Sequence, residues 1–164
     1  MKKSLFLLLF AVVSMSSFAQ FEKGTKYVGA SLTGLNLSYS TGEKFGLGLQ
    51  ATGGYFFEDS WMATAKLEYT HQWRPSPERD GNEVTIGAGA RYYFHSNGFY
   101  LGAGLQYRHA AVNKDYLQVP MEVGYCYYFN QYVSIEPAIY FEPCLNKFSD
   151  GTKVGLKLGL GFYF

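Results

Sequence analysis

The clearest candidates for catalysis are the histidines and a neighbouring serine. The chain has three histidines, and one of them lies in the run His95-Ser96-Asn97-Gly98. A serine beside a histidine could supply the nucleophile and base of acyl transfer, as a lipid-modifying enzyme would need. The same run has the composition of a hairpin turn, because Asn-Gly suits the positive φ angles of a tight loop. No carboxylate pair, phosphate loop or metal-ligand spacing accompanies it, so we predict no catalytic residue, no cofactor and no metal.

The other chemically active side chains are charged residues inside segments where apolar residues alternate with small or polar ones. Such alternation predicts strands with two different faces. On the small and polar face, four cations balance four anions: Lys66, Arg91, Arg108 and Lys157 against Glu68, Glu122, Glu136 and Glu142. Because an unpaired charge away from water is costly, we expect these eight side chains to form a paired charge network inside the fold.

The elements that must position these charges are eight predicted strands of about ten residues each. They cover residues 25–39, 45–55, 61–70, 84–94, 99–108, 117–129, 133–142 and 154–164. The first segment changes phase at Gly34, which predicts a β-bulge there. Pro120 and Pro137 lie within two strands, and since proline donates no ladder hydrogen bond we expect a bulge at each.

The composition excludes several classes of protein. The 164 residues include 19 Gly, 15 Tyr and 14 Phe, only 16% are charged, and the mean hydropathy is −0.10. No apolar run approaches the roughly 20 residues of a membrane helix. The net charge of +1 gives no footprint for nucleic acid. An all-β chain with one apolar face remains.

Residues 1–19 have the layout of a secretory signal peptide. Lys2 and Lys3 precede the apolar run 5–13, and Ser17 and Ala19 are the small residues before a cleavage site. We therefore divide the chain into a signal peptide, 1–19, and one domain, 20–164. Loss of two lysines changes the formal net charge from +1 to −1.

The connections between the predicted strands alternate in length. Tight turns at 58–60, 95–98 and 130–131 are rich in Asn, Asp, Ser and Gly. The others are more variable and include the polar stretches 74–83 and 146–152. Short turns at one end and longer loops at the other are typical of an outer-membrane barrel. We predict an all-β, eight-stranded antiparallel up-and-down transmembrane β-barrel with a filled lumen, since eight strands enclose only enough space for side chains.

Aromatic residues flank the tight turns, where an apolar band would meet lipid headgroups. This predicted periplasmic aromatic girdle comprises Phe57, Trp61, Phe94, Phe99, Phe129 and Tyr132. A water-soluble barrel with an aromatic core is the alternative. It is disfavoured because its solvent face would carry far more charge than this sequence supplies.

The opposite rim carries polar residues. His71 and His109 fall on the outward face of non-adjacent strands, and we interpret them as interfacial. Basic residues here could bind lipopolysaccharide phosphates: Lys44, Arg74, Arg79, Lys114, Lys147 and Lys153. We favour solvated loop charge, because acidic residues are mixed among them: Glu43, Glu78, Asp80, Glu83, Asp115 and Asp150.

The two cysteines, Cys126 and Cys144, are predicted to be free thiols. With a turn at 130–131, Cys126 would lie opposite about residue 135 and Cys144 opposite about residue 117. Their separation along the sheet would be roughly 30 Å at strand rise, whereas a disulfide needs Cα atoms within about 7 Å.

The chain resembles the small porin-like outer-membrane β-barrel proteins common in Bacteroidetes, with the architecture of the OmpA and OmpX barrels. The similarity rests on the leader ending Phe18-Ala19-Gln20, the segment 53–57, the Gly-x-Gly-x strands and the terminal run 161–164. It implies that the barrel-assembly machinery reads the last strand, with Leu158, Leu160, Phe162 and Phe164 as the assembly signal. It specifies fold and location far better than activity.

We therefore expect a monomeric protein of the Gram-negative outer membrane with a structural or surface-interaction role and no catalysis. Its expected partners are outer-membrane lipids, with lipopolysaccharide as a further candidate, and the assembly machinery. A lipid-modifying enzyme and a narrow low-conductance channel remain the alternatives.

Overall fold

A computed structural model describes residues 21–35, 45–73, 81–94, 97–110, 114–146 and 152–164. The predicted leader, 1–19, lies outside these residues. The strands are β1 (Lys26–Leu35), β2 (Phe45–Glu58), β3 (Trp61–Trp73), β4 (Gly81–Tyr93), β5 (Phe99–Ala110), β6 (Lys114–Gln118), β7 (Met121–Tyr125), β8 (Tyr127–Tyr128), β9 (Val133–Glu142) and β10 (Lys153–Tyr163). None of the described residues belongs to a helix long and apolar enough to cross a membrane.

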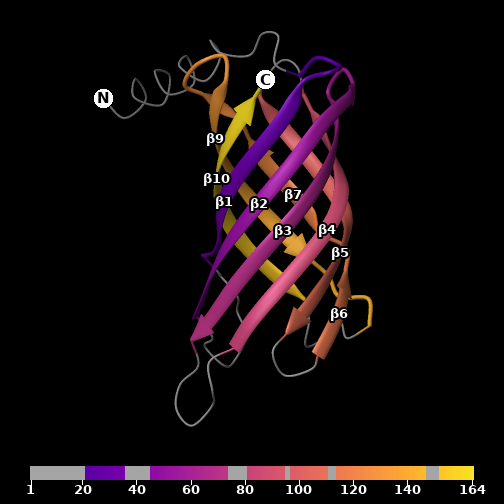
Figure 1. Cartoon of the computed structure of the whole chain (residues 1–164), viewed down its shortest axis with the longest axis vertical. Coiled ribbons are helices and arrows are strands. Elements are labelled where there is room, and N and C mark those ends of the chain that lie inside the picture. The colour runs from indigo at the N-terminus through magenta and orange to yellow at the C-terminus, as the bar shows by residue number, and fades with distance from the viewer. Residues whose placement is uncertain (1–20, 36–44, 74–80, 95–96, 111–113, 147–151) are drawn as a thin grey trace, which may run out of the picture.

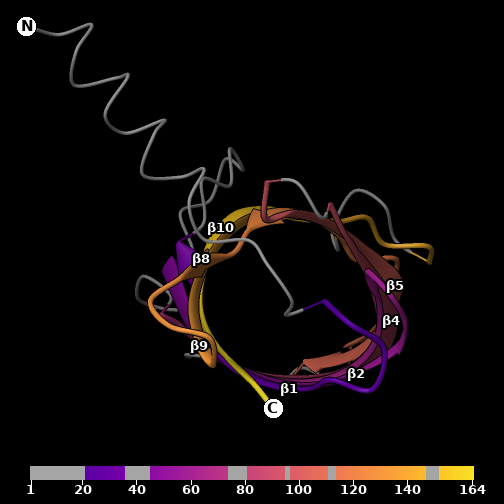
Figure 2. The ribbon, with the colours of Figure 1, turned by 90° about the horizontal axis from the view of Figure 1, so that it is seen from above.

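The strands form one closed antiparallel barrel (Figure 1). The strands β1 to β5 pair in chain order, β7 pairs with β5 and β9, and β10 pairs with both β9 and β1, so the sheet has closed on itself. The three short strands β6, β7 and β8 follow one another along a single position between β5 and β9. Eight strand positions result, as predicted, and the view along the axis shows a ring (Figure 2).

Side chains alternate strictly between the two faces of this sheet. Along β10, for example, Leu156, Leu158 and Leu160 are exposed on the outside while Lys157 and Gly159 are buried within. A strand that crosses hydrocarbon must satisfy every backbone N–H and C=O through its neighbours, and closure achieves this. The period of two therefore places the apolar residues on the outer wall and the polar ones in the lumen.

Of the β-bulges predicted at Gly34, Pro120 and Pro137, the structure bears out only some. The β1–β10 register shifts between Leu32 and Leu35, which confirms the bulge expected near Gly34. Pro120 lies in the break between β6 and β7. The bulge expected at Pro137 was wrong, because Pro137 pairs in unbroken register with Leu158. On the other side of β9, pairing stops between Ala138, which pairs with β7, and Ile135, which pairs with β8. The N–H group that proline lacks therefore faces the break between β7 and β8.

Other strand boundaries also differ from prediction, and β2, β3 and β5 end two or three residues later than expected, at Glu58, Trp73 and Ala110. The sixth predicted strand, 117–129, is divided into three and starts at Lys114, and β4 starts at Gly81 rather than at residue 84. Cys126 and Cys144 are free, as predicted, and both are buried. The backbone of Cys144 forms an isolated β-bridge with Gln118, one residue away from the expected partner position.

The tight turns predicted at 58–60 and 130–131 occur there, whereas residues 95–96 of the third predicted turn lie outside the described residues. Between β2 and β3, Ser60 adopts a positive φ of 67°. Between β8 and β9, the Oδ1 atom of Asn130 accepts hydrogen bonds from the backbone N–H groups of Tyr132, at 2.8 Å, and Val133, at 2.9 Å. Both turns lie at the end of the barrel where the described chain begins, at Phe21, and where it ends, at Phe164; we call this the end that holds the termini.

Candidate functional site

The lumen is the candidate functional site, and Arg91 on β4 lies at its centre. Its Nε donates to Oε1 of Glu122 on β7 at 2.5 Å, and its Nη1 donates to Oε2 of Glu136 on β9 at 3.2 Å. The second oxygen of Glu122 accepts a hydrogen bond from Nζ of Lys157 on β10. These four side chains, which we call the Arg91 network, join strands from opposite walls of the barrel.

Hydroxyl groups complete this network. Glu136 accepts hydrogen bonds from the hydroxyls of Tyr27, Tyr163 and Ser134, each at 2.8 Å. The Arg91 guanidinium lies 4.7 Å from the ring centroid of Tyr100, a cation–π contact. Charged hydrogen bonds in a low-dielectric interior are strong, and their cost when broken is high. The Arg91 network and its hydroxyl partners therefore hold β1, β4, β7, β9 and β10 in one arrangement.

A second polar layer lies toward the end of the barrel away from the termini. Lys66 Nζ is 3.5 Å from Oε1 of Glu142. The Oε1 atom of Glu68 accepts hydrogen bonds from the Thr33 hydroxyl at 2.8 Å and the Thr70 hydroxyl at 3.1 Å. All eight side chains of the predicted lumen network thus point inward; Arg108 is described with its partner below.

Glu83 and Lys153 also belong to this second layer, although we had interpreted both as solvated loop charges. Oε2 of Glu83 lies 2.7 Å from Lys153 Nζ and 3.7 Å from Arg108 Nη1. That interpretation was wrong because β4 and β10 extend further than predicted. The signal was available: Glu83 has the same parity as Thr85, and Lys153 the same parity as Lys157. With them, the described lumen contains five carboxylates and five cations.

An aromatic cluster closes the lumen at the end that holds the termini, and sequence reasoning missed it. Phe21, which precedes β1, is only 4% exposed and stacks on Tyr93 with ring centroids 4.4 Å apart. The cluster, which we call the aromatic stopper, comprises Phe21, Phe56, Tyr93, Tyr128 and Tyr163. In Figure 2, the indigo stretch leading into β1 lies within the outline of the ring.

Backbone hydrogen bonds tie the stretch carrying Phe21 across the barrel mouth. The Phe21 carbonyl accepts from the Ser60 N–H at 2.8 Å, and the Phe56 carbonyl accepts from the Gly24 N–H at 2.8 Å. Gly24 has a φ of 96°, which favours glycine. The Lys23 N–H donates to Oδ1 of Asp59 at 2.9 Å. Phe21 lies before the first alternating segment of the sequence, so the pattern gave no sign of its burial, and only the folded structure shows its role.

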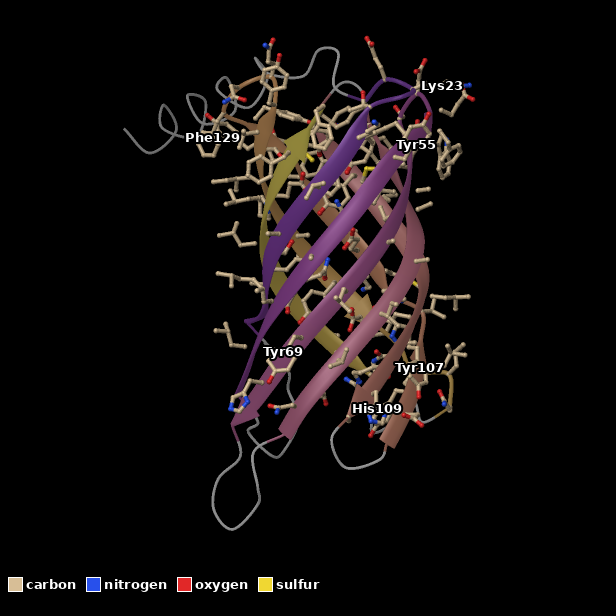
Figure 3. All side chains as sticks on the ribbon, viewed as in Figure 1. Lys23, Tyr55, Tyr69, Tyr107, His109 and Phe129 are labelled. Atoms are coloured by element: carbon tan, nitrogen blue, oxygen red, sulfur yellow. The ribbon has the colours of Figure 1, made fainter. Side chains whose placement is uncertain are left out.

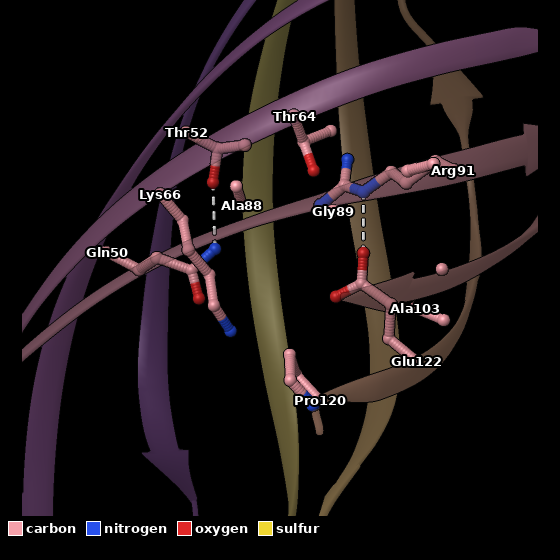
Figure 4. A pocket seen from close by; sticks show the side chains of 12 residues that line it. Gln50, Thr52, Thr64, Lys66, Ala88, Gly89, Arg91, Ala103, Pro120 and Glu122 are labelled. Carbon is pink, nitrogen blue, oxygen red and sulfur yellow. Dashed lines mark hydrogen bonds and ion pairs between the residues drawn. The ribbon is translucent and has the colours of Figure 1, made fainter. Parts of the chain in front are cut away.

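The space left in the lumen is small. A void of about 30 Å³ lies among Gln50, Lys66, Arg91 and Glu122 (Figure 4). Another of about 10 Å³ lies toward Glu142. A water needs roughly 10–15 Å³ of such volume, so these voids have room for one or two waters and are too small for a hydrated ion. The large hollow, about 810 Å³, lies on the outer wall and is lined by outward side chains such as Leu67, Ile86 and Leu105.

The outer wall carries the remaining predicted residues. The six members of the predicted aromatic girdle are all exposed near the end that holds the termini: Phe57, Trp61, Phe94, Phe99, Phe129 and Tyr132. Tyr55 and Phe129 at that end contrast with Tyr69 and Tyr107 at the other in Figure 3. The four residues of the predicted assembly signal are exposed along β10: Leu158, Leu160, Phe162 and Phe164.

The two histidines that the structure describes, His71 and His109, each lie beside one polar side chain. His71 Nδ1 lies 2.8 Å from Asn82 Oδ1, and His109 Nδ1 lies 2.7 Å from Asp115 Oδ1, both on the outer wall. Residues 95–96 lie outside the described residues, as do four of the basic rim residues: Lys44, Arg74, Arg79 and Lys147. Within the described ranges, no group of three His, Cys, Asp or Glu side chains could hold a metal ion.

Comparison with known proteins identifies the family. The model of the outer membrane protein beta-barrel domain matches residues 5–164. The chain belongs to this family. Membership implies an outer-membrane location, in agreement with the closed barrel and its apolar outer wall. The comparison with curated proteins returned no match.

Solved structures share the barrel with this family member. Neisserial surface protein A (NspA) has a TM-score of 0.63 at 20% identity, covering 87% of this chain and 100% of its own. Yersinia pestis Ail in a phospholipid nanodisc has a TM-score of 0.60 at 13% identity, with coverage of 87% and 100%. The N-terminal β-barrel domain of Pseudomonas aeruginosa OprF has a TM-score of 0.58 at 18% identity, with coverage of 87% and 98%. At these identities the likeness concerns the fold.

Proposed function

We propose that this protein is a closed, non-conducting barrel of the Gram-negative outer membrane with a structural or surface-interaction role and no catalytic activity. The observation that carries the proposal is the filled lumen: among the described residues, the Arg91 network and the aromatic stopper occupy it, and the voids beside the network measure about 30 and 10 Å³. A pore would need a continuous wide path, which barrels with more strands supply.

The proposal includes the orientation of the barrel. The N-terminal leader would deliver the chain to the periplasm, which would place both termini and the tight turns on that side. The longer loops would then face the cell exterior, where a surface role would be performed. Two relatives in fold are described as a surface protein and an attachment invasion protein, which fits such a role. We propose a monomer that contacts outer-membrane lipids and is assembled through its last strand by the barrel-assembly machinery.

The test is conductance of the refolded protein. Proteoliposome swelling and planar-bilayer recordings should show no solute entry and no steady channel current for the wild type. A steady nanosiemens-scale current would refute the closed lumen and support a channel.

Catalysis is tested separately through the lipids themselves. The mass spectrum of lipid A from a deletion strain should match that of the parent strain. A difference in acyl chains that the restored gene reverses would instead support a lipid-modifying enzyme.

A further inference from the structure

The hollow of about 810 Å³ on the outer wall of the barrel is a candidate lipid site, and we call it the outer-wall hollow. Its floor is formed by three small residues, Gly53, Ala65 and Ala88, which lie in one row across β2, β3 and β4. A Cβ atom added at Gly53 would meet no other atom within 4 Å, so the space above this row is open. Larger outward side chains border the floor: Leu67, Ile86, Leu105 and Tyr107.

The hollow runs from the middle of the apolar band to the rim away from the termini. On β3, Ala65 lies midway between Trp61 of the aromatic girdle and Tyr69, which Figure 3 labels at the opposite end. The lining continues through Leu105 to Tyr107, which Figure 3 places near that same opposite end. A lipid whose headgroup lies at that rim could therefore extend an acyl chain along the hollow toward the middle of the bilayer.

An apolar hollow in this position requires an apolar occupant. The hydrocarbon layer holds no water to fill it, and an empty space would forfeit the dispersion contacts of the side chains around it. A flexible acyl chain can follow an uneven floor of small residues between larger ones. A second copy of the barrel fits less well, because two convex walls touch along a line and would leave the hollow empty.

We propose that the outer-wall hollow binds one acyl chain of lipopolysaccharide. The orientation in the proposed function places the rim beside Tyr107 at the cell exterior, where lipopolysaccharide is the expected lipid. The inference rests on that orientation and not on whether the lumen conducts. On the opposite wall the outward residues are large, as at Leu156 and Leu158 of β10, so the site belongs to one side of the barrel.

The test measures which lipid the barrel retains. The mature protein is refolded in phosphatidylcholine nanodiscs that contain equal amounts of lipid A and phosphatidylethanolamine, and the lipids that stay on the released barrel are counted by native mass spectrometry. The wild type should retain lipid A with an enrichment of about twofold to fivefold, because the chain exchanges one apolar surrounding for another and gains only closer packing.

A filling variant and a matched control decide whether the hollow is responsible. Ala88→Phe places a ring on the floor and should abolish the enrichment. Val154→Phe adds bulk to the outward face of β10, at the same end of the barrel but away from the hollow, and should keep it. Heat-modifiable gel migration shows that both variants fold.

Several outcomes would overturn the proposal. Equal retention of the two lipids by the wild type, or an undiminished enrichment in Ala88→Phe, would remove the site. Enrichment of phosphatidylethanolamine that Ala88→Phe abolishes would assign the hollow to a phospholipid, and a dimer that the same variant abolishes would assign it to a second copy.

The orientation is tested separately by thiol labelling of Ser76→Cys on intact cells. Labelling is expected, because this residue belongs to a loop that the proposed function places outside the cell. An unlabelled Ser76→Cys would refute the orientation and this inference together. Labelling without lipid A enrichment would refute this inference alone.

Discussion

Arg91 and Glu122 are joined inside the barrel by a hydrogen bond of 2.5 Å between Nε and Oε1. The two residues come from β4 and β7, which are not neighbours in the sheet, because β5 lies between them. The register nevertheless sets them in one row of the sheet, because Arg91 lies opposite Gly102 of β5 and Gly102 lies opposite Glu122. Since Gly102 has no side chain, the Glu122 side chain lies over it and the two charged groups meet on the lumen side of the sheet.

Arg91→Met should destabilise the barrel by about 3–5 kcal/mol, because it leaves the carboxylates of Glu122 and Glu136 buried with too few cations. Urea unfolding in phospholipid vesicles, followed by tryptophan fluorescence, measures the loss. The double variant Arg91→Met/Glu136→Gln retains the Lys157–Glu122 pair and restores the charge balance. Its loss of unfolding free energy should be smaller than the sum of the losses in Arg91→Met and Glu136→Gln. Strict additivity would mean that the two residues are not energetically coupled.

Phe21→Ala should cost about 3 kcal/mol, because it removes a ring packed between Tyr93 and Tyr128 in the aromatic stopper. The matched change is Phe129→Ala, whose ring is 61% exposed on the outer wall and should matter less. Both variants are compared by the same unfolding measurement. Because the Arg91 network still fills the lumen, Phe21→Ala should remain silent in planar-bilayer recordings; a new current would show that the stopper alone seals the barrel.

Leu158→Arg should cost about 2–4 kcal/mol, since it places a charge on the lipid face near the middle of the bilayer. Leu158 is 48% exposed on the outer wall and lies opposite Leu32 of β1. Glu22→Arg, at the exposed stretch before β1, is the control and should change the unfolding free energy little. An equal cost for the two changes would contradict a lipid-facing β10.

Gly124→Ala should destabilise the barrel by about 1–3 kcal/mol through overpacking. The aromatic ring of Tyr100 lies directly over Gly124, and a Cβ atom there would overlap its ring carbons. Removing the Tyr100 ring in the double variant Gly124→Ala/Tyr100→Leu should recover part of the lost unfolding free energy. Thermal or urea unfolding of the single and double variants measures this recovery. No recovery would indicate that the backbone of β7, and not the Tyr100 ring, resists the added methyl group.

Alternation in the sequence was enough to predict the eight strands and their two faces, and the eight charges that it assigned to the inner face all lie there. The reason is that period-two alternation is a local property: each strand must show one face to lipid and one to the lumen. The same alternation indicates inward positions for Glu83 and Lys153. They were missed only because β4 and β10 were predicted to start later than they do.

Which charges meet depends on the tertiary structure. Arg91 contacts Glu122 over Gly102 and Glu136 one strand further round the barrel, and both contacts require the register of strands that are far apart in the sequence. Phe21 gave no local signal because its partners come from β2, β4, β8 and β10. Pro137 kept its register because the gap that accommodates it belongs to a neighbouring strand. Closure of the sheet brings these groups together, and closure is a property of the whole chain.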